Sequence, residues 1–133
     1  MQEMTRTKAS NLLSSLARIQ DIRLSSSDRH AFIKKVREAF HKSNGAFYFI
    51  FNGRSYYIFE DAYKIYAASD KARELNEASY HETLAILPKT ITDAINWRQV
   101  ADNMAAGVGY SQFFDGEEYF SEGFWIYDQG SMI

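Results

Sequence analysis

The 133-residue sequence contains no cysteine and a single proline. Without cysteine there is no disulfide, no thiolate metal site and no cysteine nucleophile, which fits a cytoplasmic protein. The longest apolar run, Ala46–Phe51, has six residues, far fewer than the roughly 20 that cross a bilayer. The N-terminal residues carry many charges and lack the apolar segment of a signal peptide. We therefore expect a cytoplasmic protein without a membrane-spanning segment.

Catalytic and cofactor motifs are missing as well. His81 begins an HExxH zinc motif, but Ala85 stands where the second histidine ligand belongs. The sequence has no GxSxG, Walker A or GxGxxG motif. An acidic cluster at 115–118 resembles a cation site, but such clusters are more often solvated surface. The sequence therefore favours a non-enzymatic protein with no metal and no cofactor.

Two features of the composition are unusual, the aromatic content and the distribution of charge along the chain. Aromatic residues make up 16% of the chain, and charge is unevenly distributed although the formal net charge is only −2. Residues 1–73 hold 13 Lys and Arg against 7 Asp and Glu, whereas residues 74–133 hold 2 against 10. Charge asymmetry bears on partners and association rates rather than on the fold. Either the two halves form separate charged surfaces, or they neutralise each other in the folded domain.

Apolar spacing and turn signals predict one α+β domain over residues 1–133, with helices packed on a small antiparallel sheet. The first two helices are expected to form an antiparallel pair. Helical periodicity and capping residues predict five helices. The first covers 7–23, and the second runs from the serines at 25–27 to about 42. The other three cover about 61–77, 80–86, and 97 to the glycine at 107.

The clearest local signal spans residues 46–59. Two aromatic and β-branched segments flank Asn52-Gly53, a pair that tolerates the positive φ angles of a two-residue type I′ turn. This pattern predicts a β-hairpin. Near the C-terminus, Asp-Gly and Glu-Gly turn signals predict a short aromatic meander with strands over 110–114, 117–120 and 124–128.

A basic row lies on the second predicted helix. His30, Lys34, Arg37 and His41 recur at helical spacing, on the side away from the apolar stripe. Together with Arg54 at the tip of the hairpin, this row is suited to follow phosphates while aromatic rings stack on bases. It therefore indicates direct nucleic-acid binding. The alternative is a solvated helix face, which the overall pI near 5.9 favours.

The C-terminal region favours the opposite kind of partner. Its aromatic residues lie among carboxylates that have no neighbouring base. An acidic aromatic patch suits a basic protein surface, and spaced carboxylates can occupy the positions of nucleic-acid phosphates in a groove. An ordinary acidic surface is again the alternative. The residues predicted to bind a partner are Asp115, Glu117, Glu118, Tyr119, Glu122 and Trp125.

A family resemblance reaches the same region. Two segments carry it, Ile95-Asn96-Trp97-x-x-Val100-Ala101-x-Asn103-Met104 and Glu122-Gly123-Phe124-Trp125-Ile126. They resemble the C-terminal segment of the antirestriction protein A family over about 35 of the 133 residues. Members of that family are carried by plasmids, transposons and phages, and they mimic DNA to block restriction enzymes. The resemblance implies a mobile-element origin and an inhibitory binding role.

The leading hypothesis is a small binding protein, a phage or mobile-element inhibitor of a host defence complex of the restriction or CRISPR type. Its partner would be a host protein or nucleoprotein complex with a basic groove, reached through the acidic aromatic surface. The alternative hypothesis is a nucleic-acid-binding accessory protein that uses the basic row and the aromatic hairpin.

Overall fold

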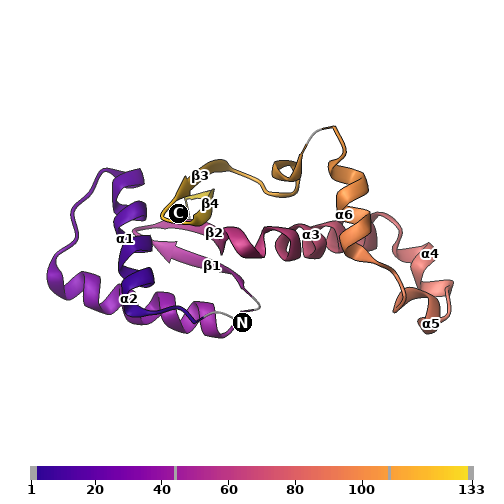
Figure 1. The fold of residues 1–133 in the computed structure, drawn as a ribbon, viewed down its shortest axis with the longest axis horizontal. Coiled ribbons are helices and arrows are strands. Elements are labelled where there is room, and N and C mark those ends of the chain that lie inside the picture. Colours follow the sequence, from indigo (N-terminus) through magenta and orange to yellow (C-terminus); the bar gives the residue numbers. More distant parts are fainter. Residues whose placement is uncertain (1–2, 44, 108, 132–133) are drawn as a thin grey trace. The chain divides into compact units, whose positions relative to one another are not determined.

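The computed structural model describes residues 3–43, 45–107 and 109–131. Within these ranges the chain forms six α-helices, two short 3₁₀ helices and a four-stranded antiparallel sheet (Figure 1). The predicted α+β class is confirmed. The chain divides into two compact units: Met1–Tyr63 with Asp115–Ile133 form unit 1, and Lys64–Phe114 form unit 2. The expectation of a single domain stays a prediction.

The sheet of unit 1 has the strand order β1-β2-β4-β3, and its neighbouring strands are antiparallel. Its hairpins turn on residue pairs with positive φ, 47° and 80° at Asn52-Gly53, and 55° and 80° at Glu122-Gly123. Both pairs match a type I′ turn, so these two turn predictions are confirmed. The strands are β1 (Ala46–Phe51), β2 (Arg54–Glu60), β3 (Glu117–Ser121) and β4 (Phe124–Ser131).

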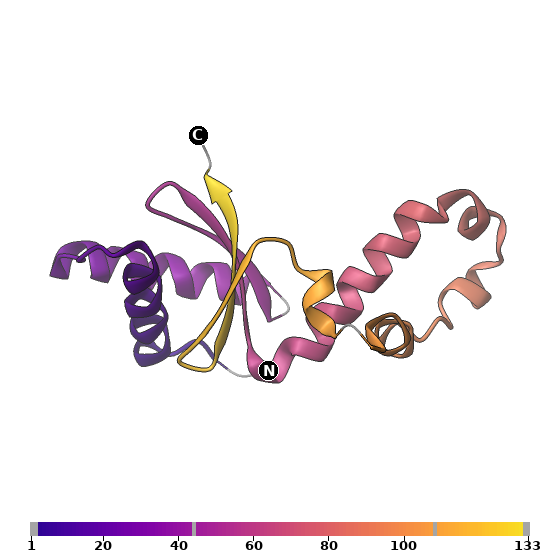
Figure 2. The ribbon, with the colours of Figure 1, turned by 90° about the horizontal axis from the view of Figure 1, so that it is seen from above.

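The helices α1 (Arg6–Gln20) and α2 (Ser26–His41) pack with one face of this sheet into a single core. Thr5 and Ser25 cap them, each accepting a backbone hydrogen bond from the first turn. The helices cross one another in both views, so the expected antiparallel pairing is wrong (Figures 1 and 2). The largest completely buried side chains of this core include Met4, Leu12, Leu13, Leu16, Phe51, Tyr56, Ile58 and Ile126.

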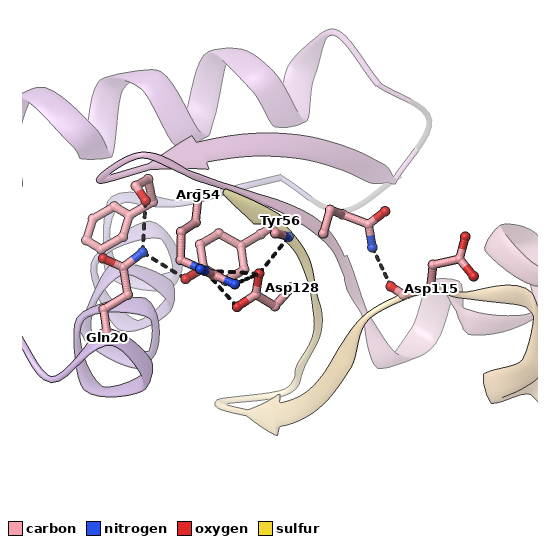
Figure 3. A network of polar contacts seen from close by, with 8 residues as sticks. Gln20, Arg54, Tyr56, Asp115 and Asp128 are labelled. Carbon is pink, nitrogen blue, oxygen red and sulfur yellow. Dashed lines mark hydrogen bonds and ion pairs between the residues drawn. The ribbon is translucent and has the colours of Figure 1, made fainter. Parts of the chain in front are cut away.

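Polar contacts fasten the first hairpin on both sides (Figure 3). From α1, the Gln20 Nε2 donates to the Phe51 carbonyl oxygen at 2.9 Å and to the Tyr56 hydroxyl at 2.8 Å. From β4, the Asp128 carboxylate binds Arg54, with Nη2–Oδ1 at 2.9 Å and Nε–Oδ2 at 3.0 Å. Burial raises the pKa of the Tyr56 phenol. These contacts fix the strands against which α1 and α2 pack.

Unit 2 is helical. Its two longer helices, α3 (Lys64–Ser79) and α6 (Trp97–Ala105), contact each other. Their buried residues are all alanines, whose small side chains allow close approach. The helices between them, α4 (His81–Ile86) and α5 (Lys89–Thr92), are short and contain no buried residue. Asn96 caps α6, because its side chain accepts a hydrogen bond from the Gln99 backbone.

The predicted strand over 110–114 is wrong. Tyr110–Phe113 form a 3₁₀ helix that follows Gly109, whose φ is 83°. The Gln112 side chain donates to the carbonyl oxygens of Met104 and Gly109, at 2.7 and 3.0 Å. These local hydrogen bonds hold the turn compact, so the aromatic residues here do not extend the sheet. The C-terminal meander is therefore a two-stranded hairpin.

Two other predictions differ in detail. The helix expected over 61–77 begins as a 3₁₀ turn at Asp61–Tyr63, before α3 starts at Lys64. The helix expected over 80–86 is α4, and although Ser79 and Glu82 have the spacing of a capping box, Tyr80 is its N-cap and makes no capping hydrogen bond through its side chain. Ser79 is instead the last residue of α3.

Candidate functional site

A basic groove of about 510 Å³ lies along α2 in unit 1. The four residues of the predicted basic row, His30, Lys34, Arg37 and His41, all line it. α2 buries Ile33, Val36 and Phe40 in the core, so the row at the intervening positions faces outward. The structure thus brings the four predicted α2 residues together in one concave site.

Two cationic side chains that the sequence analysis did not include complete the groove. Lys42 follows α2 directly, and Arg6 comes from the first turn of α1. Lys42 lies eight residues after Lys34, so helical spacing places it on the same side. Arg6 is 24 residues from its contact His30, and only the tertiary structure brings them together.

The N-terminal residues before and at the start of α1 contact two residues of the groove, Arg37 and His30. Met4 is completely buried, and its carbonyl oxygen accepts a hydrogen bond from Arg37 Nε at 3.0 Å. Arg37 Nη2 also lies 3.7 Å from Glu3 Oε1. Arg6 Nη2 lies 3.2 Å from His30 Nδ1, which acts as the acceptor because a guanidinium only donates. Arg37 and His30 therefore join α2 to the N-terminal part of the chain.

The groove has an excess of positive charge. Of the described residues that line it, Arg6, Lys34, Arg37 and Lys42 are cationic and Glu38 is the one acid. Lys34 and Lys42 are exposed, and none of the ion pairs found between residues 3 and 131 involves them. Lysine and arginine also contribute apolar stems to such walls. Such an arrangement of cationic side chains can hold an anionic group.

Arg54 does not line this groove. Its guanidinium is engaged by Asp128, a carboxylate whose side chain is only 10% exposed. The hydrogen bond and charge of Asp128 raise the pKa of Arg54. The structure thus gives Arg54 a role in joining β2 to β4, and it does not bring this residue together with the basic row.

The predicted acidic residues are divided between the two faces of the β3–β4 hairpin. Tyr119 packs against the core beneath α1 and α2, and the alternation of a strand places Glu117 on that same face and Glu118 on the opposite one. A hydrogen bond to Glu117 raises the pKa of Tyr119. Glu118 accepts a hydrogen bond from the Tyr127 hydroxyl at 2.8 Å. Asp115 precedes β3, and its carbonyl oxygen accepts a hydrogen bond from Gln129 (Figure 3).

Trp125 belongs to a small cluster on the face that carries Glu118. Its ring lies 4.5 Å from the ring of Phe120, which is 54% exposed, and its indole N–H donates to Asp61 Oδ1 at 2.7 Å. We use the name acidic aromatic patch for Asp61, Glu118, Phe120 and Trp125 together with Glu122 of the adjoining turn. Asp61 and Phe120 were not predicted as binding residues from the sequence. Asp61 is 64 residues from Trp125 along the chain, so only the tertiary structure brings the two together.

Two other kinds of feature, a metal site and a membrane-spanning helix, are absent from the described ranges. No group of three or more histidines and carboxylates there could hold a metal ion. None of the helices in these ranges combines the length and apolarity that crossing a membrane requires. Comparisons with models of protein families, with curated proteins and with solved structures found no match.

Proposed function

We propose that this chain is a binding protein that holds the phosphate backbone of a nucleic acid in the basic groove along α2. The observation that carries the proposal is the convergence of Arg6, Lys34, Arg37 and Lys42 on one concave surface with a single acid, Glu38. A groove of this charge attracts a polyanion, and each phosphate neutralised by Lys or Arg releases counterions.

The dimensions of the groove support a chain rather than a single ion. Lys42 follows Lys34 by eight positions. At a rise of 1.5 Å per residue, the two lysines are about 12 Å apart along the helix direction. That span matches several consecutive phosphates of a nucleic-acid strand. Phosphate contacts position a protein without reading sequence, so we expect binding with little sequence preference.

Charge reversal at the two exposed lysines tests the proposal. Lys34→Glu/Lys42→Glu should abolish binding of fluorescent single-stranded or duplex DNA, measured by anisotropy. The matched control is Lys35→Glu/Lys89→Glu, which makes the same charge change outside the groove lining. Arg37 is left unchanged because it also anchors Met4. Equal loss in both variants, or no binding by the parent protein, would contradict the proposal.

The acidic aromatic patch supports a second function, the one expected from the resemblance to antirestriction proteins. In this proposal the patch docks on the basic groove of a host defence complex. The supporting observation is that the patch combines the exposed Phe120 ring with carboxylates, and the ion pairs found in the described ranges involve neither Glu118 nor Glu122. Exposed aromatics beside unpaired charge are typical of protein interfaces.

The second function is tested by inhibition of DNA cleavage by purified restriction and CRISPR nuclease complexes. The parent protein should inhibit one of them, and Glu118→Lys/Glu122→Lys should not. The variant Glu74→Lys/Glu82→Lys, with the same charge change in unit 2, should inhibit as the parent does. Absence of inhibition by the parent protein, or equal inhibition by the patch variant, would reject this function.

A further inference from the structure

β1 forms an outer edge of the sheet in unit 1 (Figures 1 and 2). Proteins usually protect such an edge with lysine, proline or a β-bulge, because its outward N–H and C=O groups can pair with another strand. β1 is Ala-Phe-Tyr-Phe-Ile-Phe, without charge or proline. Its register with β2 is unbroken, and the one register shift noted in the sheet lies between β2 and β4. None of the usual protective devices is present in this strand.

The backbone geometry of the hairpin exposes part of β1 for pairing. A two-residue turn makes Phe51 and Arg54 the first hydrogen-bonded pair of the hairpin. Because the pattern alternates, Ala46 and Ile50 direct their N–H and C=O groups away from β2. The Ile50 side chain is 55% exposed. Because β2 is the only neighbour of β1 in the described sheet, these outward backbone groups are not paired within it.

The opposite edge of the sheet differs in charge. β3 begins with Glu117 and Glu118, both of which are exposed. Charged side chains on an edge strand are one of the devices that oppose pairing with a further strand. β1 has no charge to repel a second β1. Of the two edge strands, only β1 is thus without charged side chains.

We infer that β1 pairs antiparallel with the β1 strand of a second copy of this chain, which joins two four-stranded sheets into one of eight strands. A two-fold axis lets both uncharged edges use the same residues. The pairing also places Tyr48 and Ile50 among the same residue types of the partner, and aromatic and β-branched neighbours stabilise cross-strand pairs. This pairing depends on neither the basic groove nor the acidic aromatic patch.

The dimer should dissociate on dilution. A six-residue edge offers less buried surface than a standard stable interface. Sedimentation velocity should therefore show a monomer at low concentration and a dimer at high concentration. A purified protein that stays monomeric at every concentration would overturn the inference, and would leave a foreign strand as the remaining partner for this edge.

Ile50→Lys tests the edge directly, because it places a charge on an exposed side chain and leaves the core unchanged. The matched control is Ile86→Lys in unit 2, where the side chain is 82% exposed. Far-ultraviolet circular dichroism should show both variants folded. Dimerisation should be lost in Ile50→Lys and kept in Ile86→Lys. A dimer that survives Ile50→Lys would contradict pairing through β1.

Hydrogen exchange on the unaltered protein gives a readout that does not rely on a variant. The amide protons of Ala46 and Ile50 should exchange slowly at high protein concentration and become fast on dilution. Amides of Phe47 and Phe49, which face β2, should be slow at both concentrations. Rapid exchange of Ile50 in a proven dimer would overturn the inference, because it would place the contact elsewhere.

Discussion

Arg54 and Asp128 are 74 residues apart in the sequence, yet Nη2 and Nε of the arginine bind the two carboxylate oxygens at 2.9 and 3.0 Å. Asp128 Oδ1 also accepts the Gly130 backbone N–H at 2.9 Å. The carboxylate thus lies where the register between β2 and β4 shifts, at Ser55 and Tyr56. This pair removes Arg54 from the surface that the sequence suggested for nucleic-acid binding.

Asp128→Asn should lower the melting temperature by several degrees, because it weakens a bidentate pair whose carboxylate is largely shielded from water. Glu77→Gln is the control, since it removes an ion pair with Arg73 in which both side chains are about half exposed. That pair should contribute almost nothing measurable. Thermal unfolding by circular dichroism measures both. Equal small shifts would show that Asp128 is not a structural residue.

Gly116→Ala should destabilise the protein strongly. Gly116 has a φ of +100°, and a Cβ there would lie 1.9 Å from the Asp128 carbonyl oxygen. We expect a loss above about 2 kcal/mol, because steric overlap with backbone adds to the cost of a left-handed conformation. Gly53→Ala, at φ +80° with open space around it, should lose only about 1 kcal/mol. Urea unfolding measures both, and similar losses would contradict this explanation.

Tyr127 should make the protein less stable at alkaline pH. Burial and the hydrogen bond to Glu118 raise the pKa of its phenol above the ordinary value of about 10. Above that pH the unfolded chain loses a proton that the folded chain keeps, so the free energy of unfolding falls as pH rises.

Tyr127→Phe should reduce this dependence, measured by urea unfolding between about pH 9 and about pH 11. The hydroxyl it removes is also a hydrogen-bond donor, so some loss of stability at neutral pH is expected, about 1 kcal/mol. Tyr80→Phe, at a side chain that is 58% exposed, is the control and should leave the pH dependence unchanged. An unaltered slope in Tyr127→Phe would contradict the assignment.

Elements set by local chemistry were predictable from the sequence. The hairpin at Asn52-Gly53 and the turn at Glu122-Gly123 follow from residues that accept positive φ. The first two helices follow from apolar spacing, and the second also from a serine that caps its N-terminus. The segment 110–114 was not predictable from its aromatic composition, because side-chain hydrogen bonds from Gln112 decide its conformation.

The candidate site was predictable only where it lies on one element. The basic row of α2 shares a helix face, so spacing alone identified it. The contribution of Arg6 depends on how α1 crosses α2, and the pairing of Asp61 with Trp125 depends on the sheet. The sequence placed Arg54 among the nucleic-acid-binding residues because its partner Asp128 is distant along the chain and could not be identified from spacing.

The most direct measurement of the central claim is the salt dependence of DNA binding. In a plot of log affinity against log salt concentration, the slope reports the number of phosphates that Lys and Arg neutralise. Lys34→Gln/Lys42→Gln should make that slope shallower by about 2, since each contact contributes about 0.9. Lys35→Gln/Lys89→Gln, with the same loss of charge outside the groove lining, should run parallel to the parent protein. If both double variants and the parent give the same slope, the basic groove does not bind phosphates.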